Sequence, residues 1–223
     1  MSNLSYVKHI DLLSCKLGPH FPIWIQKLEN LTRLDISITS ISDTVPPEFS
    51  KMTFDYLNLS SNNISGKIPD LSSSLGYTPT IDLSSNHSDS PIPHLPSSLT
   101  SLNLSRNKFS GDVSRNNLHG IITSCLSNLT RMAQEGFLLP PNVHPYAFLF
   151  ANLAHFNLPY PNEEEYVDYA MIEWQGDERE FTRNLVLLKS IDLSSNNLTG
   201  NIPHELTNLH EPLVLNLSKN VVL

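Results

Sequence analysis

The sequence predicts an α/β solenoid, a right-handed stack of short coils with parallel strands on its concave face and mostly irregular or 3-10 structure on its convex side. Three observations support this class. An apolar-x-apolar segment followed by Asn or a substitute recurs every 21 to 24 residues, and most repeats also carry an apolar-Pro pair. Charged residues make up only 16% of the 223, while Ser and Asn, which favour turns, are abundant.

Each repeating unit contains a short segment whose alternating side chains point into and out of the stack. Successive segments begin 24, 23, 24 and 21 residues apart, and the last two begin 24 apart. These intervals match the leucine-rich repeat, whose unit spans about 20 to 29 residues. The segments are Ile10–Leu12, Leu34–Ile36, Leu57–Leu59, Ile81–Leu83, Leu102–Leu104, Ile191–Leu193 and Leu215–Leu217.

The Asn that follows each segment is predicted to be structural. It stands where the chain bends, so its amide can bond backbone groups of neighbouring coils that would otherwise be buried without partners. Cys15 and Thr39 occupy the same position in their coils and are small enough to bond these backbone groups in the same way, but more weakly than Asn. The Asn residues are Asn62, Asn86, Asn107, Asn196 and Asn220.

Several departures from the repeat divide the chain. Asn107 and Asn116 are only nine residues apart, which predicts a truncated repeat near 109–118. Residues 133–187 show no repeat. We therefore expect leucine-rich repeats in 1–132, a non-repeat island in 133–187 and terminal repeats in 188–223. Ser88 replaces an apolar core residue, and both ends lack caps, so the isolated chain is expected to be marginally stable or to aggregate.

Charge is concentrated in the island. Residues 133–184 hold nine acidic side chains against two arginines, and ten of the eighteen aromatic residues. The rest of the chain is nearly neutral. This distribution argues against nucleic acid as a partner, because phosphate binding requires a basic surface.

Two stretches, 57–69 (LNLSSNNISGKIP) and 191–203 (IDLSSNNLTGNIP), resemble the plant extracellular subtype of leucine-rich repeat. That subtype occurs in receptor-like kinases, receptor-like proteins and cell-wall polygalacturonase inhibitors. The island, with its run 166–181 (YVDYAMIEWQGDEREF), resembles the island of plant receptor-like proteins of the defence type, and the inhibitors lack one. The subtype covers most of residues 4–132 and 188–220.

The resemblance implies an extracellular region that recognises a peptide, protein or elicitor. The parent would be a single-pass plasma-membrane protein that signals through partner kinases. Two alternatives stay open, a soluble inhibitor of a microbial cell-wall-degrading enzyme and a non-functional truncated fragment. The chain itself shows no signal peptide and no membrane-spanning stretch.

Candidate ligand-binding residues fall in two groups. On the concave face, His9, Arg33 and Tyr56 are the distinctive outward side chains, because the neighbouring Asp/Asn column is at least as well explained as a scaffold ladder. In the island, exposed aromatics beside charges favour contact with a peptide or protein partner, although they could equally pack the island onto the array. The island candidates are Tyr166, Asp168, Glu173, Trp174 and Asp177.

No enzymatic chemistry is predicted. The sequence lacks HExxH, GxSxG and phosphate-loop motifs, and its histidines show no ligand spacing to Cys15 or Cys125, so we expect no catalytic residue, metal or cofactor. Nine Asn-x-Ser/Thr sequons suit a glycosylated ectodomain. Asn30 and Asn128, on the outer side before Leu-Thr, are the favoured sites.

Overall fold

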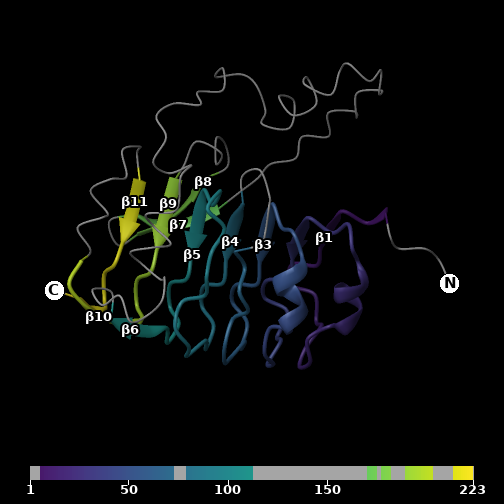
Figure 1. Ribbon diagram of the computed structural model, residues 1–223, viewed down its shortest axis with the longest axis horizontal. Helices are drawn as coiled ribbons and strands as arrows, with labels where there is room; N and C mark the ends of the chain where they lie inside the picture. The colour runs from purple at the N-terminus through teal and green to yellow at the C-terminus, as the bar shows by residue number, and fades with distance from the viewer. Residues whose placement is uncertain are drawn as a thin grey trace, which may run out of the picture.

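A computed structural model describes residues 6–72, 79–112, 170–174, 177–181, 189–202 and 213–222. The described repeats wind into a solenoid, in which each coil contributes one strand to a seven-stranded parallel sheet of order β1-β2-β3-β4-β5-β9-β11. Figure 1 shows these strands side by side from the N-terminal to the C-terminal end. They are β1 His9–Asp11, β2 Arg33–Asp35, β3 Tyr56–Asn58, β4 Thr80–Asp82, β5 Ser101–Asn103, β9 Lys189–Asp192 and β11 Leu213–Asn216. The predicted solenoid is confirmed.

The core is a spine of apolar side chains stacked coil on coil. Strand register aligns Leu34 with Leu57, and the same position continues through later coils to Ile191. A second inward position, two residues later in the chain, is also buried in each inner coil, as Ile36 and Leu59 show. In the first coil the equivalent Leu12 is only partly buried, because no described coil packs against its other side. Burying leucine-sized side chains contributes roughly 1.5–3 kcal/mol each to stability.

The asparagine that follows each segment joins adjacent coils, as predicted. We call these residues, Asn62, Asn86, Asn107, Asn196 and Asn220, the ladder asparagines. The Asn62 carbonyl accepts hydrogen bonds from the backbone N–H groups of Thr39 and Ile41, at 3.0 and 3.1 Å. Its amide donates to the carbonyls of Ile36 and Leu59, at 2.9 and 3.1 Å. Equivalent bonds form at Asn86, Asn107, Asn196 and Asn220. Thr39 stands at the position of the ladder asparagine in its coil and makes a weaker set of bonds, in which its hydroxyl donates a hydrogen bond to the Ile36 carbonyl.

The convex side is irregular except for two short 3-10 helices in the described coils, η2 Ile23–Lys27 and η3 Pro47–Lys51. Both follow the apolar-Pro pairs of the sequence, where a fixed φ and a missing N–H suit the start of a helix. The buried Phe49 of η3 packs edge-on against Phe21, with ring centroids 5.2 Å apart, and lies 5.4 Å from Phe54. Aromatic packing therefore fills the convex half of the first coils.

A second parallel sheet of order β12-β10-β6 lies at the other end of the coils from the first (Figure 1). Its strands are β6 Ser110–Asp112, β10 Asn197–Gly200 and β12 Val221–Val222. A bridge between Ser65 and His87 marks the same position in earlier coils. In β6 and β10 this part of the coil is the apolar-Ser/Thr-Gly motif, Phe109–Gly111 and Leu198–Gly200.

The concave sheet passes directly from β5 to β9 although 89 residues separate Ser101 from its register partner Ser190. Asn196 joins these two coils in the same way as the other ladder asparagines. It accepts a hydrogen bond from the Phe109 backbone N–H and donates one to the Leu104 carbonyl. Residues 109–112 thus continue the solenoid, and the remainder of the expected truncated repeat, 113–118, lies outside the described residues. The antiparallel hairpin of β7 Ala170–Trp174 and β8 Asp177–Phe181 falls within the predicted island. The domain boundaries stay predictions.

Ser88 occupies a core position, as its place in the repeat predicts. It is 1% exposed, and its hydroxyl finds no hydrogen-bond partner within the described part of the chain. A buried hydroxyl without a partner costs about 1–3 kcal/mol. We expect Ser88→Ala to raise the free energy of unfolding by about 1 kcal/mol in urea denaturation. The matched Ser105→Ala should instead lower it, because the Ser105 hydroxyl donates to Asn103 at 2.8 Å.

Candidate ligand-recognition surface

Two rows of outward side chains cross the concave sheet. Strand register places one row directly before the inward Leu or Ile of each strand and the other row directly after it. The first row is His9, Arg33, Tyr56, Thr80, Ser101, Ser190 and Val214. The second row is Asp11, Asp35, Asn58, Asp82, Asn103, Asp192 and Asn216.

The structure brings the three predicted concave residues together on adjacent strands, since His9 pairs with Arg33 and Arg33 with Tyr56. The Arg33 guanidinium carbon lies 4.8 Å from the Tyr56 ring centroid, a cation–π arrangement. Arg33 is only 8% exposed, whereas His9 is exposed. The predicted trio is therefore one accessible histidine beside a packed arginine–tyrosine pair, and its role in binding stays a prediction.

Electrostatics of the trio follow from these contacts. Burial, and then the Asp35 carboxylate, raises the pKa of the Tyr56 hydroxyl, which donates a 3.2 Å hydrogen bond to that carboxylate. Partial burial, and then the positive charge of Arg33, lowers the pKa of His9. Both shifts favour the neutral forms, so Arg33 is the one charged member of the trio near neutral pH.

The Asp/Asn row is a scaffold ladder. Its carboxylates and amides accept a bond from the backbone N–H two residues on, as Asp35 does from Ser37 at 2.9 Å. Members also pair across coils, with the amide donating to the preceding carboxylate. The pairs are Asn58 to Asp35 at 2.9 Å, Asn103 to Asp82 at 3.3 Å, and Asn216 to Asp192 at 3.1 Å. These hydrogen bonds give the row a scaffold role, and its role in ligand binding stays a prediction.

A hollow of about 290 Å³ runs along this face. Its described lining comes from six consecutive coils, from Leu13 in the first to Asp192 in the coil of β9. Of the predicted trio, only Tyr56 is among these lining residues. Sequence reasoning missed Leu13 and Ile38. Each is apolar at a repeat position where the other six described coils have a polar residue, and that difference is the signal that could have revealed them.

Asp82 lies in the lining of the hollow. Burial raises its pKa to about 6, against hydrogen bonds from Ser84 and Asn103 that favour the ionised form. The negative charge of Asp35 adds to the increase. The central carboxylate of this surface therefore titrates in a mildly acidic range.

This titration predicts a pH-dependent stability. The folded chain binds the Asp82 proton more tightly than the unfolded chain, so stability is lost as pH rises from about 4 to about 6. Asp82→Asn removes this loss. We expect the difference between the urea midpoints of the variant and of wild type to rise in favour of the variant between pH 4 and 6 and to stay constant above pH 6. A lead that does not change with pH would contradict the assignment.

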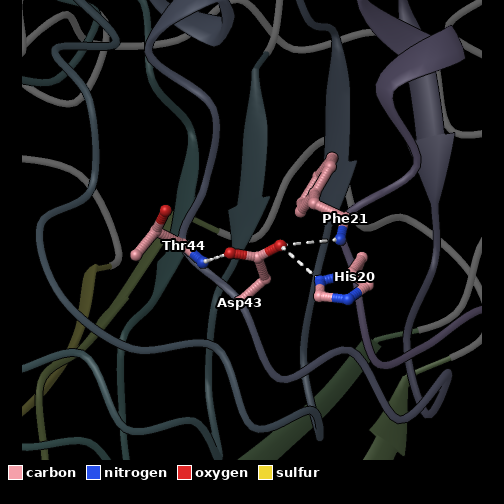
Figure 2. A network of polar contacts seen from close by, with 4 residues as sticks. All are labelled: His20, Phe21, Asp43 and Thr44. Atoms are coloured by element: carbon pink, nitrogen blue, oxygen red, sulfur yellow. Dashed lines mark hydrogen bonds and ion pairs between the residues drawn. The ribbon is translucent and has the colours of Figure 1, made fainter.

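Asp43 makes a separate network at the side of the first two coils (Figure 2). Its carboxylate accepts backbone hydrogen bonds from Thr44 at 2.8 Å and Phe21 at 3.1 Å, and lies 3.6 Å from His20 Nδ1. The bond from Thr44, then that from Phe21, lowers the pKa of Asp43. The backbone partners give this network a structural role in joining two coils.

Among the described residues, no group of three or more His, Cys, Asp or Glu side chains is arranged to hold a metal ion. The same residues include no helix long and apolar enough to cross a bilayer.

The sequons differ sharply in accessibility. Asn30, the favoured site, is exposed, as are Asn63 and Asn197, which follow ladder asparagines and were not singled out. Asn128 lies outside the described residues. The sequon asparagines Asn58, Asn86, Asn103 and Asn216 are instead hydrogen-bonded in the scaffold.

These environments predict where glycans attach. When the chain is folded in a secretory host, we expect glycans on Asn30, Asn63 and Asn197, because a glycan on a ladder asparagine such as Asn86 would prevent coil stacking. Glycopeptide mass spectrometry of the folded fraction measures this directly. Glycosylated Asn86 in folded protein would contradict the prediction.

The island candidates are placed only in part. Glu173 and Trp174 end β7, and Asp177 begins β8, so Trp174 and Asp177 are register partners at the tip of the hairpin. Tyr166 and Asp168 lie outside the described residues. Their role in binding stays a prediction.

The comparisons with known proteins match this architecture. The leucine-rich-repeat family matches residues 30–52, 54–75, 98–113 and 187–209. Receptor-like protein EIX2 of Solanum lycopersicum is 33% identical over 145 residues, covering 57% of this chain and 14% of EIX2. Receptor-like protein EIX1 of the same species is 53% identical over 77 residues, covering 33% of this chain and 7% of EIX1. The chain thus spans a small part of these relatives.

Solved structures show the same fold. The plant peptide hormone receptor RGFR1 in complex with RGF2 superposes with a TM-score of 0.53 at 20% identity, covering 98% of this chain and 29% of the receptor. The Arabidopsis receptor kinase HAESA in complex with the peptide hormone IDA and the co-receptor SERK1 gives 0.50 at 20% identity, covering 100% and 36%. The chain therefore carries leucine-rich repeats, has the fold of a leucine-rich-repeat solenoid and, over 57% of its length, is similar to a plant receptor-like protein.

Proposed function

We propose that the chain is part of the extracellular ligand-recognition region of a plant cell-surface receptor-like protein, which binds a peptide, protein or elicitor and signals through partner kinases. The parent protein would lie in the plasma membrane with these repeats outside the cell. The observation that carries the proposal is the hollow that crosses six coils of the concave face.

The surface chemistry of the hollow suits recognition. Its described lining combines hydroxyl and amide groups with the carboxylates of Asp82 and Asp192 and the aromatic ring of Tyr56. A rigid concave sheet holds these groups in fixed positions, so little conformational entropy is lost on binding. The receptor assignment is supported by the tomato relatives, both of them receptor-like proteins.

A second recognition surface is proposed at the island, formed by Tyr166, Asp168, Glu173, Trp174 and Asp177. The β7–β8 hairpin supports it, because the hairpin brings Trp174 and Asp177 opposite one another. Trp174→Ala and Asp177→Ala in the intact parent should weaken binding of its partner. Unchanged binding in both variants would count against this surface.

The concave proposal is tested by selecting ligands on the full chain from a displayed library of random heptapeptides. Thr80→Arg places a long cation in the middle of the hollow, at a register position where β2 already carries Arg33, so the strand tolerates it. Selected peptides should lose binding to this variant. The control is Ser42→Arg, which adds the same side chain at an exposed position outside the described lining.

The outcomes are distinct. Peptides that bind wild type and Ser42→Arg equally, and Thr80→Arg at least about ten-fold more weakly, support the concave site. Enrichment of no sequence, or equal binding to all three chains, would overturn it. A urea denaturation curve for each variant confirms that the fold is retained.

A further inference from the structure

One ladder asparagine stands in a glycosylation sequon. Asn86, His87 and Ser88 form the triplet Asn-x-Ser, which marks Asn86 as an acceptor for an N-linked glycan. After each of the other four ladder asparagines, the residue two positions later is apolar, so no sequon forms. These apolar residues are Ile64, Phe109, Leu198 and Val222.

The sequon exists because Ser88 replaces a core residue. Ile64, Phe109 and Leu198 are each buried at this position of their coils. Ser88 is equally buried, at 1% exposed, but its hydroxyl has no hydrogen-bond partner in the part of the chain that the structure describes. Buried polar groups are nearly always paired, so this hydroxyl contributes no bond to the folded coil. In an unfolded chain the same hydroxyl completes the sequon.

The apolar residue therefore has two effects in the other coils. It packs into the core, and it keeps the ladder asparagine out of a sequon. Replacement by serine in the coil of β4 removes both effects at once.

Folded Asn86 has no room for a sugar. The residue is 5% exposed, and its Nδ2 donates to the carbonyls of Leu59, Leu83 and Ser84 at 2.9, 3.2 and 3.1 Å. Its Oδ1 accepts the Ile64 backbone N–H at 2.9 Å. A sugar on Nδ2 would replace one of the two hydrogens of that nitrogen and would lie between the closely packed coils of β3 and β4. Glycosylation and closure of these coils exclude one another.

Chain order leaves Asn86 open to modification during synthesis. Its backbone N–H donates to the Arg106 carbonyl at 3.2 Å, and the Ser88 N–H donates to Asn107 Oδ1 at 3.1 Å. These partners belong to the next coil, which is synthesised later. The far side of the β4 coil therefore stays uncovered until residue 107 has emerged and folded.

We propose that Asn86 is a glycan acceptor in the nascent chain, and that Ser88 thereby divides new chains into a modified population and a folding population. In the modification, a bond forms between Asn86 Nδ2 and C1 of an oligosaccharide. The bond from C1 to the pyrophosphate of the lipid carrier breaks, the lipid pyrophosphate leaves, and Nδ2 loses one proton. A modified chain cannot close the β4 coil, whereas an unmodified chain folds.

This inference rests on the extracellular location in the proposed function, because the secretory route supplies the lipid-linked oligosaccharide. The test fuses the full chain to a secretion signal in insect cells and compares secreted with retained chains by glycopeptide mass spectrometry. We expect a glycan on Asn86 in retained chains and unmodified Asn86 in secreted chains.

Two substitutions of Ser88 separate the sequon from the rest of the coil. Ser88→Ala removes the sequon, so it should abolish the retained Asn86 glycoform and raise the secreted fraction several-fold. The matched variant Ser88→Thr keeps both the hydroxyl and the sequon, and should still yield retained chains with a glycan on Asn86.

A second host isolates the effect on stability. Ser88→Ala also removes an unpaired buried hydroxyl, which favours folding by itself. Expression of wild type and variant in the bacterial cytoplasm, without a secretion signal or glycosylation, measures that contribution as the change in soluble yield. We expect a clearly larger gain in the secreted fraction than in this soluble yield.

Three results would overturn the proposal. They are equal gains in the two hosts, unmodified Asn86 in both fractions of wild type, and a glycan on Asn86 in secreted, folded chains. The added signal supplies entry to the secretory route and no ligand takes part. Each of these results therefore leaves the ligand-recognition proposal standing, which the peptide selection tests separately.

Discussion

Asn62→Leu is expected to lower the free energy of unfolding by roughly 4 kcal/mol or more. The side chain accepts bonds from the backbone N–H groups of Thr39 and Ile41 and donates to three carbonyls. Leucine keeps the branched shape but leaves these buried groups without partners, each at about 1–3 kcal/mol. A total loss of roughly 4 kcal/mol or more is a large share of a stability of about 5–15 kcal/mol.

The neighbouring residue gives a matched control for this change. Asn63 is exposed, and its side chain makes a 3.3 Å contact with Ser42. Asn63→Leu should shift the unfolding free energy by less than about 0.5 kcal/mol. Circular dichroism during urea titration measures both variants, and equal effects would show that the ladder contributes little.

Phe49→Ala is the second change with a large expected effect. The ring is fully buried and packs against Phe21 and Phe54, so its removal leaves a cavity that rigid coils cannot close. Truncations of buried phenylalanine cost about 3–5 kcal/mol. We expect a fall of this size in the free energy of unfolding by urea denaturation, with the largest loss of protection from hydrogen exchange in the first three coils.

Ile23→Ala is the control for the loss of apolar volume on the same convex side. Ile23 is largely exposed at the start of η2. Its truncation should change stability by less than about 0.5 kcal/mol. A cost for Phe49→Ala as small as this would mean that the convex aromatics are not part of the cooperative core.

Periodicity made the fold predictable. Every described concave strand falls within one or two residues of the segment predicted from the repeat, because the inward position recurs at a fixed interval and the ladder Asn marks its end. Tyr56–Asn58, for example, begins one residue before the predicted Leu57–Leu59. The structural role of Asn62 was predictable for the same reason.

Interactions across coils were less predictable. Register between strands distant in sequence placed Ser101 beside Ser190, and no local pattern encodes that pairing. Burial of Arg33 against Tyr56 also depends on side-chain packing rather than on position in the repeat. The backbone of Ile38 has a φ of 56°, in the left-handed region that a β-branched residue disfavours, so sequence preference alone predicts the opposite.

Direct pairing of β5 with β9 affects how this chain could diversify. By the loop-closure relation, joining two paired strands through 89 residues instead of the usual 21 to 24 costs only about 1.2 kcal/mol more in chain entropy. New sequence of widely varying length could therefore be accepted at this point with little penalty to the stacked coils. Under the proposed function, a change of sequence inserted at this point alters what the chain recognises and leaves the stacked coils as they are.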